Sequence, residues 1–108
     1  IVVASGFDAS ASDPLGRMLV TASGYRQLTE MLLTVADEVC EGRVMMTHEG
    51  GYSPTYVPYC GLAVLEAMSG VKTDIDDPFG PGYERLPDQA LTDTQASRIA
   101  QAAQIHGL

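Results

Sequence analysis

Apolar residues follow two different spacings along this chain. The run "IVVAS" at 1–5 is continuous and rich in β-branched residues, a pattern typical of a strand buried on both faces of a parallel sheet. The run "RVMMTH" at 43–48 is a second short apolar segment. We therefore predict two strands, one at the start of the chain and one near its middle.

A helix is predicted after each strand. Behind Thr21, a suitable N-cap, apolar residues recur every three or four positions until Gly42, which is placed to end the helix near residue 41. A second helix is predicted over 54–69, with Ser53 as its N-cap and Pro54 at its first position. The apolar face of the first helix is expected to consist of Tyr25, Leu28, Leu32, Val35 and Val39.

The order strand, helix, strand, helix is typical of a parallel βαβ unit covered by helices. Residues 72–89 hold three of the six prolines and show no periodicity, so they are predicted to be irregular. Thr92 and Gln95 have the spacing of a capping box at the start of a last helix. The chain is thus divided into a core at 1–71, an irregular acidic segment at 72–91 and a C-terminal helix at 92–106.

Composition and charge narrow the classes of partner. The hydrophobic fraction of 45% is normal for a globular protein, and the formal charge of −8 goes with a pI near 4.4. Such an acidic chain does not favour nucleic acid or an anionic membrane surface, because both are bound through positive charge. A cationic partner is electrostatically easier.

The two cysteines and the first residues of the chain indicate the cellular compartment to expect. Cys40 and Cys60 both fall in predicted helices and show no metal-ligand spacing, which favours a reducing, cytoplasmic location. The opening segment lacks the basic leader of a signal peptide and is too short for a membrane span. Because Ile1 stands inside a predicted strand, we expect the chain to be a fragment.

The residues with chemical capacity follow the two predicted strands. In a parallel α/β sheet, ligands bind beyond the carboxyl ends of the strands. The loop "GFDASASDPLG" carries Asp8 and Asp13, and the segment around "EGGYSP" carries His48, Glu49 and Tyr52. A carboxylate can ligate a cation, and a tyrosine hydroxyl can donate a hydrogen bond to an oxyanion.

Each of these residues also has a structural interpretation. The pattern Asp13-Pro-x-Gly is common in turns, and Gly-Gly before Tyr52 fits a turn with a packed aromatic ring. Asp8 can brace its loop, and His48 can simply close the end of a strand. The acidic run Asp74, Asp76 and Asp77 lacks the glycine and terminal glutamate of an EF-hand loop, so it is interpreted as solvated charge.

Two stretches together carry a family resemblance. "ASGFDASASDPLG", followed further along by "HEGGYSPTYVPYCGLAVLE", resembles the C-terminal portion of the histone deacetylase and acetylpolyamine amidohydrolase superfamily, most nearly the bacterial class II-like histone deacetylase homologues. The resemblance covers about 1–71. It implies an α/β fold, the C-terminal part of an arginase/deacetylase-like open parallel sheet covered by helices.

The resemblance also implies a chemistry, namely zinc-dependent hydrolysis of an acetamide. It makes Asp13 one of three protein ligands to zinc and Tyr52 the catalytic donor to the tetrahedral oxyanion. Gly50 and Gly51 would shape a tight turn beside the metal and the substrate. Asp8 would support the loop from outside the ligand set.

Part of the implied site is missing from this sequence. The family draws its other zinc ligands from an Asp-x-His element and its general base from a His-His pair, whereas this chain has only His48 and His106. The chain is therefore expected to be inactive alone. The implied substrates of the complete enzyme are acetylated lysine or acetylated polyamines. The alternative is a non-catalytic assembly or regulatory module that retains the fold.

The predicted sheet also bears on self-association. Two short strands with apolar side chains on both faces leave strand edges and core surface uncovered. We therefore expect the chain to self-associate, as a strand-paired or intertwined dimer.

Overall fold

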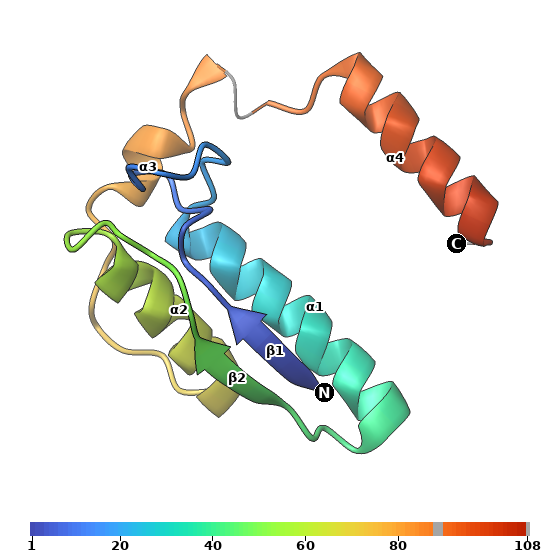
Figure 1. Cartoon of the computed structure of the whole chain (residues 1–108), viewed down its shortest axis with the longest axis horizontal. Coiled ribbons are helices and arrows are strands. Elements are labelled where there is room, and N and C mark those ends of the chain that lie inside the picture. The colour runs from blue at the N-terminus through green and yellow to red at the C-terminus, as the bar shows by residue number, and fades with distance from the viewer. Residues whose placement is uncertain (88–89, 108) are drawn as a thin grey trace.

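The computed structural model describes residues 1–87 and 90–107 and confirms the predicted α/β class (Figure 1). Strands β1 (Val2–Ser5) and β2 (Met45–His48) are parallel, with Val2 opposite Met45 and Ser5 opposite His48. Helix α1 (Ala22–Cys40) connects them. The predicted βαβ unit is therefore present, with strands slightly shorter than expected.

Helix α1 begins and ends where the sequence predicts. The Thr21 side chain accepts a hydrogen bond from the N–H of Gly24 at 3.2 Å. At the other end Glu41 and Gly42 both have left-handed backbones, with φ of 56° and 72°. The N–H of Gly42 then donates to the carbonyl oxygen of Ala36 at 3.0 Å, which closes the helix.

The predicted apolar face of α1 is largely wrong. Of its five members only Tyr25 is buried, whereas Leu28, Val35 and Val39 are 56%, 48% and 67% exposed. The buried side chains are Ala22, Tyr25, Thr29 and Ala36. Alanine and threonine leave room for α2, against which α1 packs, so small residues occupy the contact and the larger aliphatic residues point away.

Helix α2 (Val57–Ser69) begins three residues later than predicted. Residues 54–56 form a turn instead, in which Ser53 accepts hydrogen bonds from Tyr56 and Val57 through its carbonyl oxygen. Ser53 therefore caps this turn rather than the helix itself. The helix ends at Gly70, whose φ of 69° is left-handed.

Within residues 72–87 and 90–107 the structure describes two further helices. The short helix α3 (Gly80–Tyr83) lies within the segment predicted to be irregular. Helix α4 (Asp93–His106) begins at the predicted capping box, where the side chains of Thr92 and Gln95 each accept from the other's backbone N–H. Helix α4 buries none of its residues and lies apart from the sheet (Figure 1).

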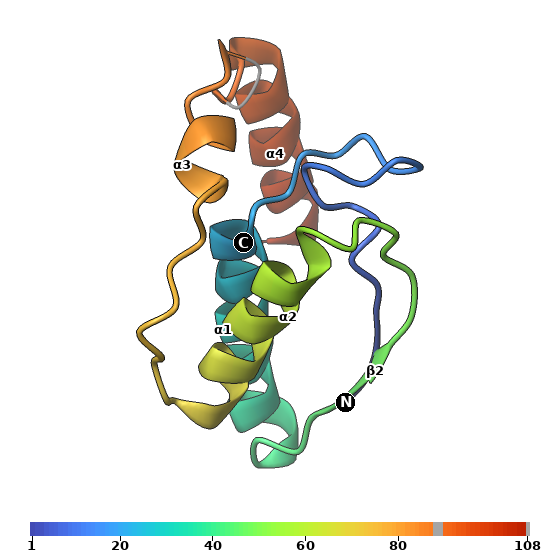
Figure 2. The same ribbon diagram turned by 90° about the vertical axis from the view of Figure 1, so that its left-hand side faces the viewer.

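The helices cover the sheet on one face. Helices α1 and α2 lie on the same face of the sheet, and the opposite face is bare (Figure 2). Val2 and Met45 on that face are 72% and 54% exposed, so in this chain the strands leave apolar surface uncovered, as the sequence predicts for two strands alone. The buried core lies between the sheet and the helices and comprises Phe7, Ala22, Tyr25, Tyr56, Cys60, Ala63 and Val64. Among the described residues, no helix is long and apolar enough to cross a membrane.

Candidate active site

The two predicted site loops extend from neighbouring strand ends. After β1 and β2, the N–H of Glu49 donates to the carbonyl oxygen of Ser5 at 3.2 Å, and the N–H of Phe7 donates to that of Gly50 at 2.7 Å. The parallel hydrogen bonding thus continues into the loops. It brings both loops to the same edge of the sheet, as the sequence predicts for a parallel pair.

Asp13 and Tyr52 are joined directly across this edge. The backbone N–H of Tyr52 donates to Oδ2 of Asp13 at 2.7 Å, although 39 residues separate them. The Asp13 side chain is buried, with the residue 8% exposed, whereas Tyr52 is 55% exposed. The structure therefore holds the Asp13 carboxylate against the backbone of Tyr52, a residue that is itself accessible.

Asp13 also forms the local turn that its Asp-Pro-x-Gly pattern predicts. Its other oxygen, Oδ1, accepts the N–H groups of Leu15 at 2.8 Å and Gly16 at 2.9 Å. An ionised carboxylate has about four lone-pair sites, and these three hydrogen bonds use three of them. One site on Oδ2 is left for another partner, so the turn and a binding role are compatible.

Asp13 is expected to be ionised at neutral pH. Burial favours the neutral acid, but the N–H groups of Tyr52, Gly16 and Leu15 together outweigh it and hold the pKa of Asp13 below its ordinary value. The carboxylate is thus charged and fixed in orientation, as a metal ligand must be.

Glycine is required where the loops cross. Gly51 has φ of 130°, and a Cβ there would lie 2.9 Å from the Cβ of Phe7. A Cβ on Gly50 would lie 2.9 Å from the carboxyl carbon of Asp8. A side chain at either glycine would therefore disturb the crossing of the two loops, and the exposed Asp8 carboxylate lies next to this crossing.

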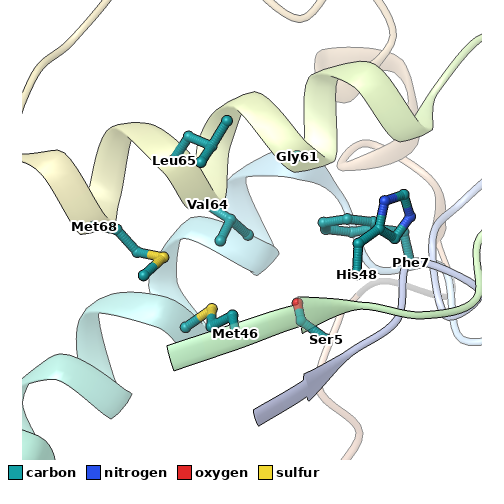
Figure 3. A pocket seen from close by; sticks show the side chains of 8 residues that line it. All are labelled: Ser5, Phe7, Met46, His48, Gly61, Val64, Leu65 and Met68. Atoms are coloured by element: carbon teal, nitrogen blue, oxygen red, sulfur yellow. The ribbon is translucent and has the colours of Figure 1, made fainter. Parts of the chain in front are cut away.

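His48 and Glu49 take no part in the Asp13–Tyr52 contact. The His48 ring packs edge-on against Phe7 with ring centroids 5.1 Å apart, at a cavity of about 290 Å³ between the strands and α2 (Figure 3). The Glu49 carboxylate accepts from the hydroxyl of Thr47 at 2.7 Å. Within the described residues, neither side chain is hydrogen-bonded to Asp13 or Tyr52.

A catalytic zinc ion would need more ligands than the described residues provide. Catalytic zinc sites use three protein ligands, and residues 1–87 and 90–107 contain no group of three His, Cys, Asp or Glu side chains able to hold a metal. Asp13 fits one ligand position, because it is charged, has a free lone pair and is oriented by hydrogen bonds. The residues present therefore fit part of a zinc site.

Sequence reasoning missed two residues next to this site. Tyr56, 1% exposed, accepts the N–H of Ala22 at 3.1 Å and donates its hydroxyl to Oδ2 of Asp77 at 2.8 Å. The prediction that Asp77 is solvated charge is wrong, because this carboxylate is half-buried and hydrogen-bonded. The sequence contains a signal for the role of Asp77, because Asp77-Pro-x-Gly repeats the turn pattern of Asp13-Pro-x-Gly.

Comparison with solved structures identifies the class of domain. The crystal structure of the HDA15 HD domain aligns with 76% of this chain at a TM-score of 0.56 and 30% sequence identity. Residues 1–68 match the model of the histone deacetylase domain. The chain belongs to the histone deacetylase domain family.

Curated relatives agree with this assignment. A histone deacetylase-like amidohydrolase of Pseudomonas aeruginosa is 46% identical over the whole chain, and histone deacetylase 8 of Arabidopsis thaliana is 40% identical over 73% of it. A probable deacetylase of Archaeoglobus fulgidus is 34% identical over 65% of the chain. The chain spans only 29%, 21% and 20% of these three relatives, so it corresponds to less than a third of each.

Proposed function

We propose that the full-length protein containing this chain is a zinc-dependent deacetylase that removes acetyl groups from acetyl-lysine or acetylpolyamine substrates. The observation that carries the proposal is the 2.7 Å hydrogen bond between the N–H of Tyr52 and Oδ2 of Asp13. It links the carboxylate of a candidate metal ligand to the backbone of a candidate oxyanion donor. The names of the relatives, amidohydrolase and deacetylase, support the same reaction class.

Tyr52 is the proposed oxyanion donor. Its backbone N–H is hydrogen-bonded to Asp13, and the residue is 55% exposed. Hydrolysis of an acetamide passes through a tetrahedral intermediate with a negatively charged oxygen, and a preorganised hydroxyl donor lowers the energy of that intermediate. The tyrosine is thus free to meet a substrate without losing its position.

Asp13 is the proposed zinc ligand. A zinc ion at such a site supplies a Lewis acid that polarises the acetyl carbonyl and the attacking water. Asp13 contributes a charged oxygen to the metal and, through the same carboxylate, aligns the backbone of Tyr52. The two roles are linked, because a shift of Asp13 would also shift Tyr52.

The remaining ligands and the general base must come from elsewhere in the full-length protein, since the described residues hold no complete metal site. We infer that the 108-residue chain alone neither retains zinc nor hydrolyses acetyl-lysine. An acetylpolyamine keeps positively charged amines, so the charge of −8 suits it, whereas an acetylated lysine side chain is neutral and only basic residues beside it in a peptide would be attracted. The alternative, a non-catalytic module with this fold, requires no role for the exposed Tyr52 phenol.

The test compares zinc content and activity in the full-length protein. Asp13→Ala should abolish both zinc retention and hydrolysis of an acetyl-lysine peptide, because a three-ligand site cannot lose a carboxylate. Asp74→Ala makes the same change of charge at an exposed position and should alter neither. Full zinc occupancy in Asp13→Ala would remove this residue from the ligand set, and a fully active variant would contradict the proposal.

A further inference from the structure

The geometry points to a positioning role for residues 77–84, which we name the strap. The strap holds Tyr56 in place and, through it, the segment that carries Tyr52. This inference rests on the proposed function, and it concerns residues that lie beyond the part of the chain that matches the family model, 1–68.

Tyr56 is the contact point between the strap and the site. It is fully buried in the turn before α2, and burial raises the pKa of its phenol, so the hydroxyl keeps its proton. That hydroxyl accepts the N–H of Ala22, the first residue of α1, and donates to Asp77. One side chain therefore connects three segments that are distant in sequence.

The strap holds Asp77 in a defined orientation. Oδ1 of Asp77 accepts the N–H of Phe79 at 2.9 Å, which leaves Oδ2 for Tyr56. The rings of Phe79 and Tyr83 pack on Tyr56, with centroids 6.0 Å and 5.4 Å away. A second link joins the same elements, since the hydroxyl of Thr21 donates to Glu84 at 3.3 Å.

Tyr56 lies four residues after Tyr52, so the segment between them is held at both ends. At one end the N–H of Tyr52 is bound to Asp13, and at the other end Tyr56 is bound to Asp77. Between them Ser53 hydrogen-bonds to Ser12 at 3.0 Å, hydroxyl to hydroxyl. Loss of the Asp77 anchor would let the Tyr52 phenol move, and misplacement by about 1 Å can cost a catalytic group much of its effect.

The test uses the full-length protein and an acetyl-lysine peptide. Asp77→Ala and Tyr56→Phe should each lower kcat by about tenfold, with KM and zinc content unchanged. Asp77→Asn keeps one acceptor oxygen and should recover part of the loss. Asp76→Ala removes a neighbouring exposed carboxylate and should keep the activity of the parent protein.

A second arm separates positioning from general stability. In a Tyr52→Phe background, Asp77→Ala should cause no further fall in kcat, because the group that it positions is already absent. A tenfold fall of kcat in both backgrounds would overturn the inference. Tyr56→Phe keeps the packed ring, so it tests the inference even if Asp77→Ala does not fold, and its full activity would also overturn the inference. A parent protein that leaves the acetyl-lysine peptide intact would overturn the proposed function, whereas full activity of the strap variants in an active parent would overturn the strap inference alone.

Discussion

At the scale of single residues, the same turn pattern serves two purposes in this chain. Asp13 and Asp77 each begin an Asp-Pro-x-Gly turn and use Oδ1 to accept a backbone N–H two residues later. Each then uses Oδ2 to bind a tyrosine of the 52–56 segment. The turns could be predicted from the sequence, because their hydrogen bonds are local. The partners of Oδ2 could not, because only the fold brings them close.

Gly51 offers a test of the crossing of the two loops. Gly51→Ala should lower the free energy of unfolding by about 2 to 3 kcal/mol, because alanine at φ of 130° is strained and its Cβ would meet Phe7. Gly70→Ala is the control, because Gly70 also has a positive φ but a Cβ added there would have no atom within 4 Å. This substitution should lower the free energy of unfolding by only about 1 kcal/mol. Urea unfolding of both variants gives the comparison. Equal losses would mean that the loops can separate freely.

At the scale of elements, the ends of α1 were easier to predict than its faces. Caps depend on neighbouring residues, and Thr21 and Gly42 fulfil their predicted roles. The buried face depends on the shape of α2, which selects the small side chains of Thr29 and Ala36. Spacing alone identified the aliphatic stripe, in which Leu28, Val35 and Val39 are exposed.

Glu66 links helices α1 and α2 to Thr73, and its ionisation should make the stability of the fold depend on pH. Its carboxylate, on α2, accepts from both the hydroxyl and the N–H of Thr73 and is paired with Arg26 on α1. The Thr73 hydroxyl, Arg26 and the Thr73 N–H, in that order, lower the pKa of Glu66 to about 2, against the opposing effect of burial. Because this pKa is below the ordinary value of 4.5, ionised Glu66 stabilises the fold above about pH 4.5.

That stabilisation should be lost as the pH falls from 4.5 toward 2. We expect the free energy of unfolding of the chain to fall more steeply over this range than that of Glu66→Gln, which has no charge to lose. The measurement is urea unfolding at pH values from 7 to 2. Parallel curves for the two proteins would show that the Arg26–Glu66–Thr73 contacts contribute nothing that depends on ionisation.

At the scale of the whole molecule, the order of strands and helices could be predicted, but their degree of burial could not. The apolar runs identified the elements, whereas burial on both faces also requires partners beyond two strands and two helices. In this chain Val2 and Met45 remain exposed on the bare face of the sheet. In the proposed function, the further zinc ligands likewise lie outside this chain, because the described residues contain no group of three side chains able to hold a metal.

The bare face leads to a prediction about oligomeric state. Burial of apolar surface is worth about 25 cal/mol per Å², so we expect the isolated chain to self-associate at micromolar concentration, more strongly at high salt because the charge of −8 is then screened. Light scattering after size-exclusion chromatography measures the mass. Val2→Thr with Met45→Thr should favour the monomer, whereas Ile105→Thr, at an exposed position on α4, should not. A folded monomer of 11.5 kDa at all salt concentrations would contradict the prediction.

The central claim is that Tyr52 stabilises an oxyanion beside a metal held by Asp13. The most direct measurement is kcat of the full-length protein on an acetyl-lysine peptide, with zinc content determined in parallel. Tyr52→Phe should lower kcat by about 10²- to 10³-fold with zinc retained, whereas Tyr59→Phe on α2 should have little effect. A fall of less than about threefold in both kcat and kcat/KM for Tyr52→Phe would contradict the claim and leave Tyr52 as a packing residue.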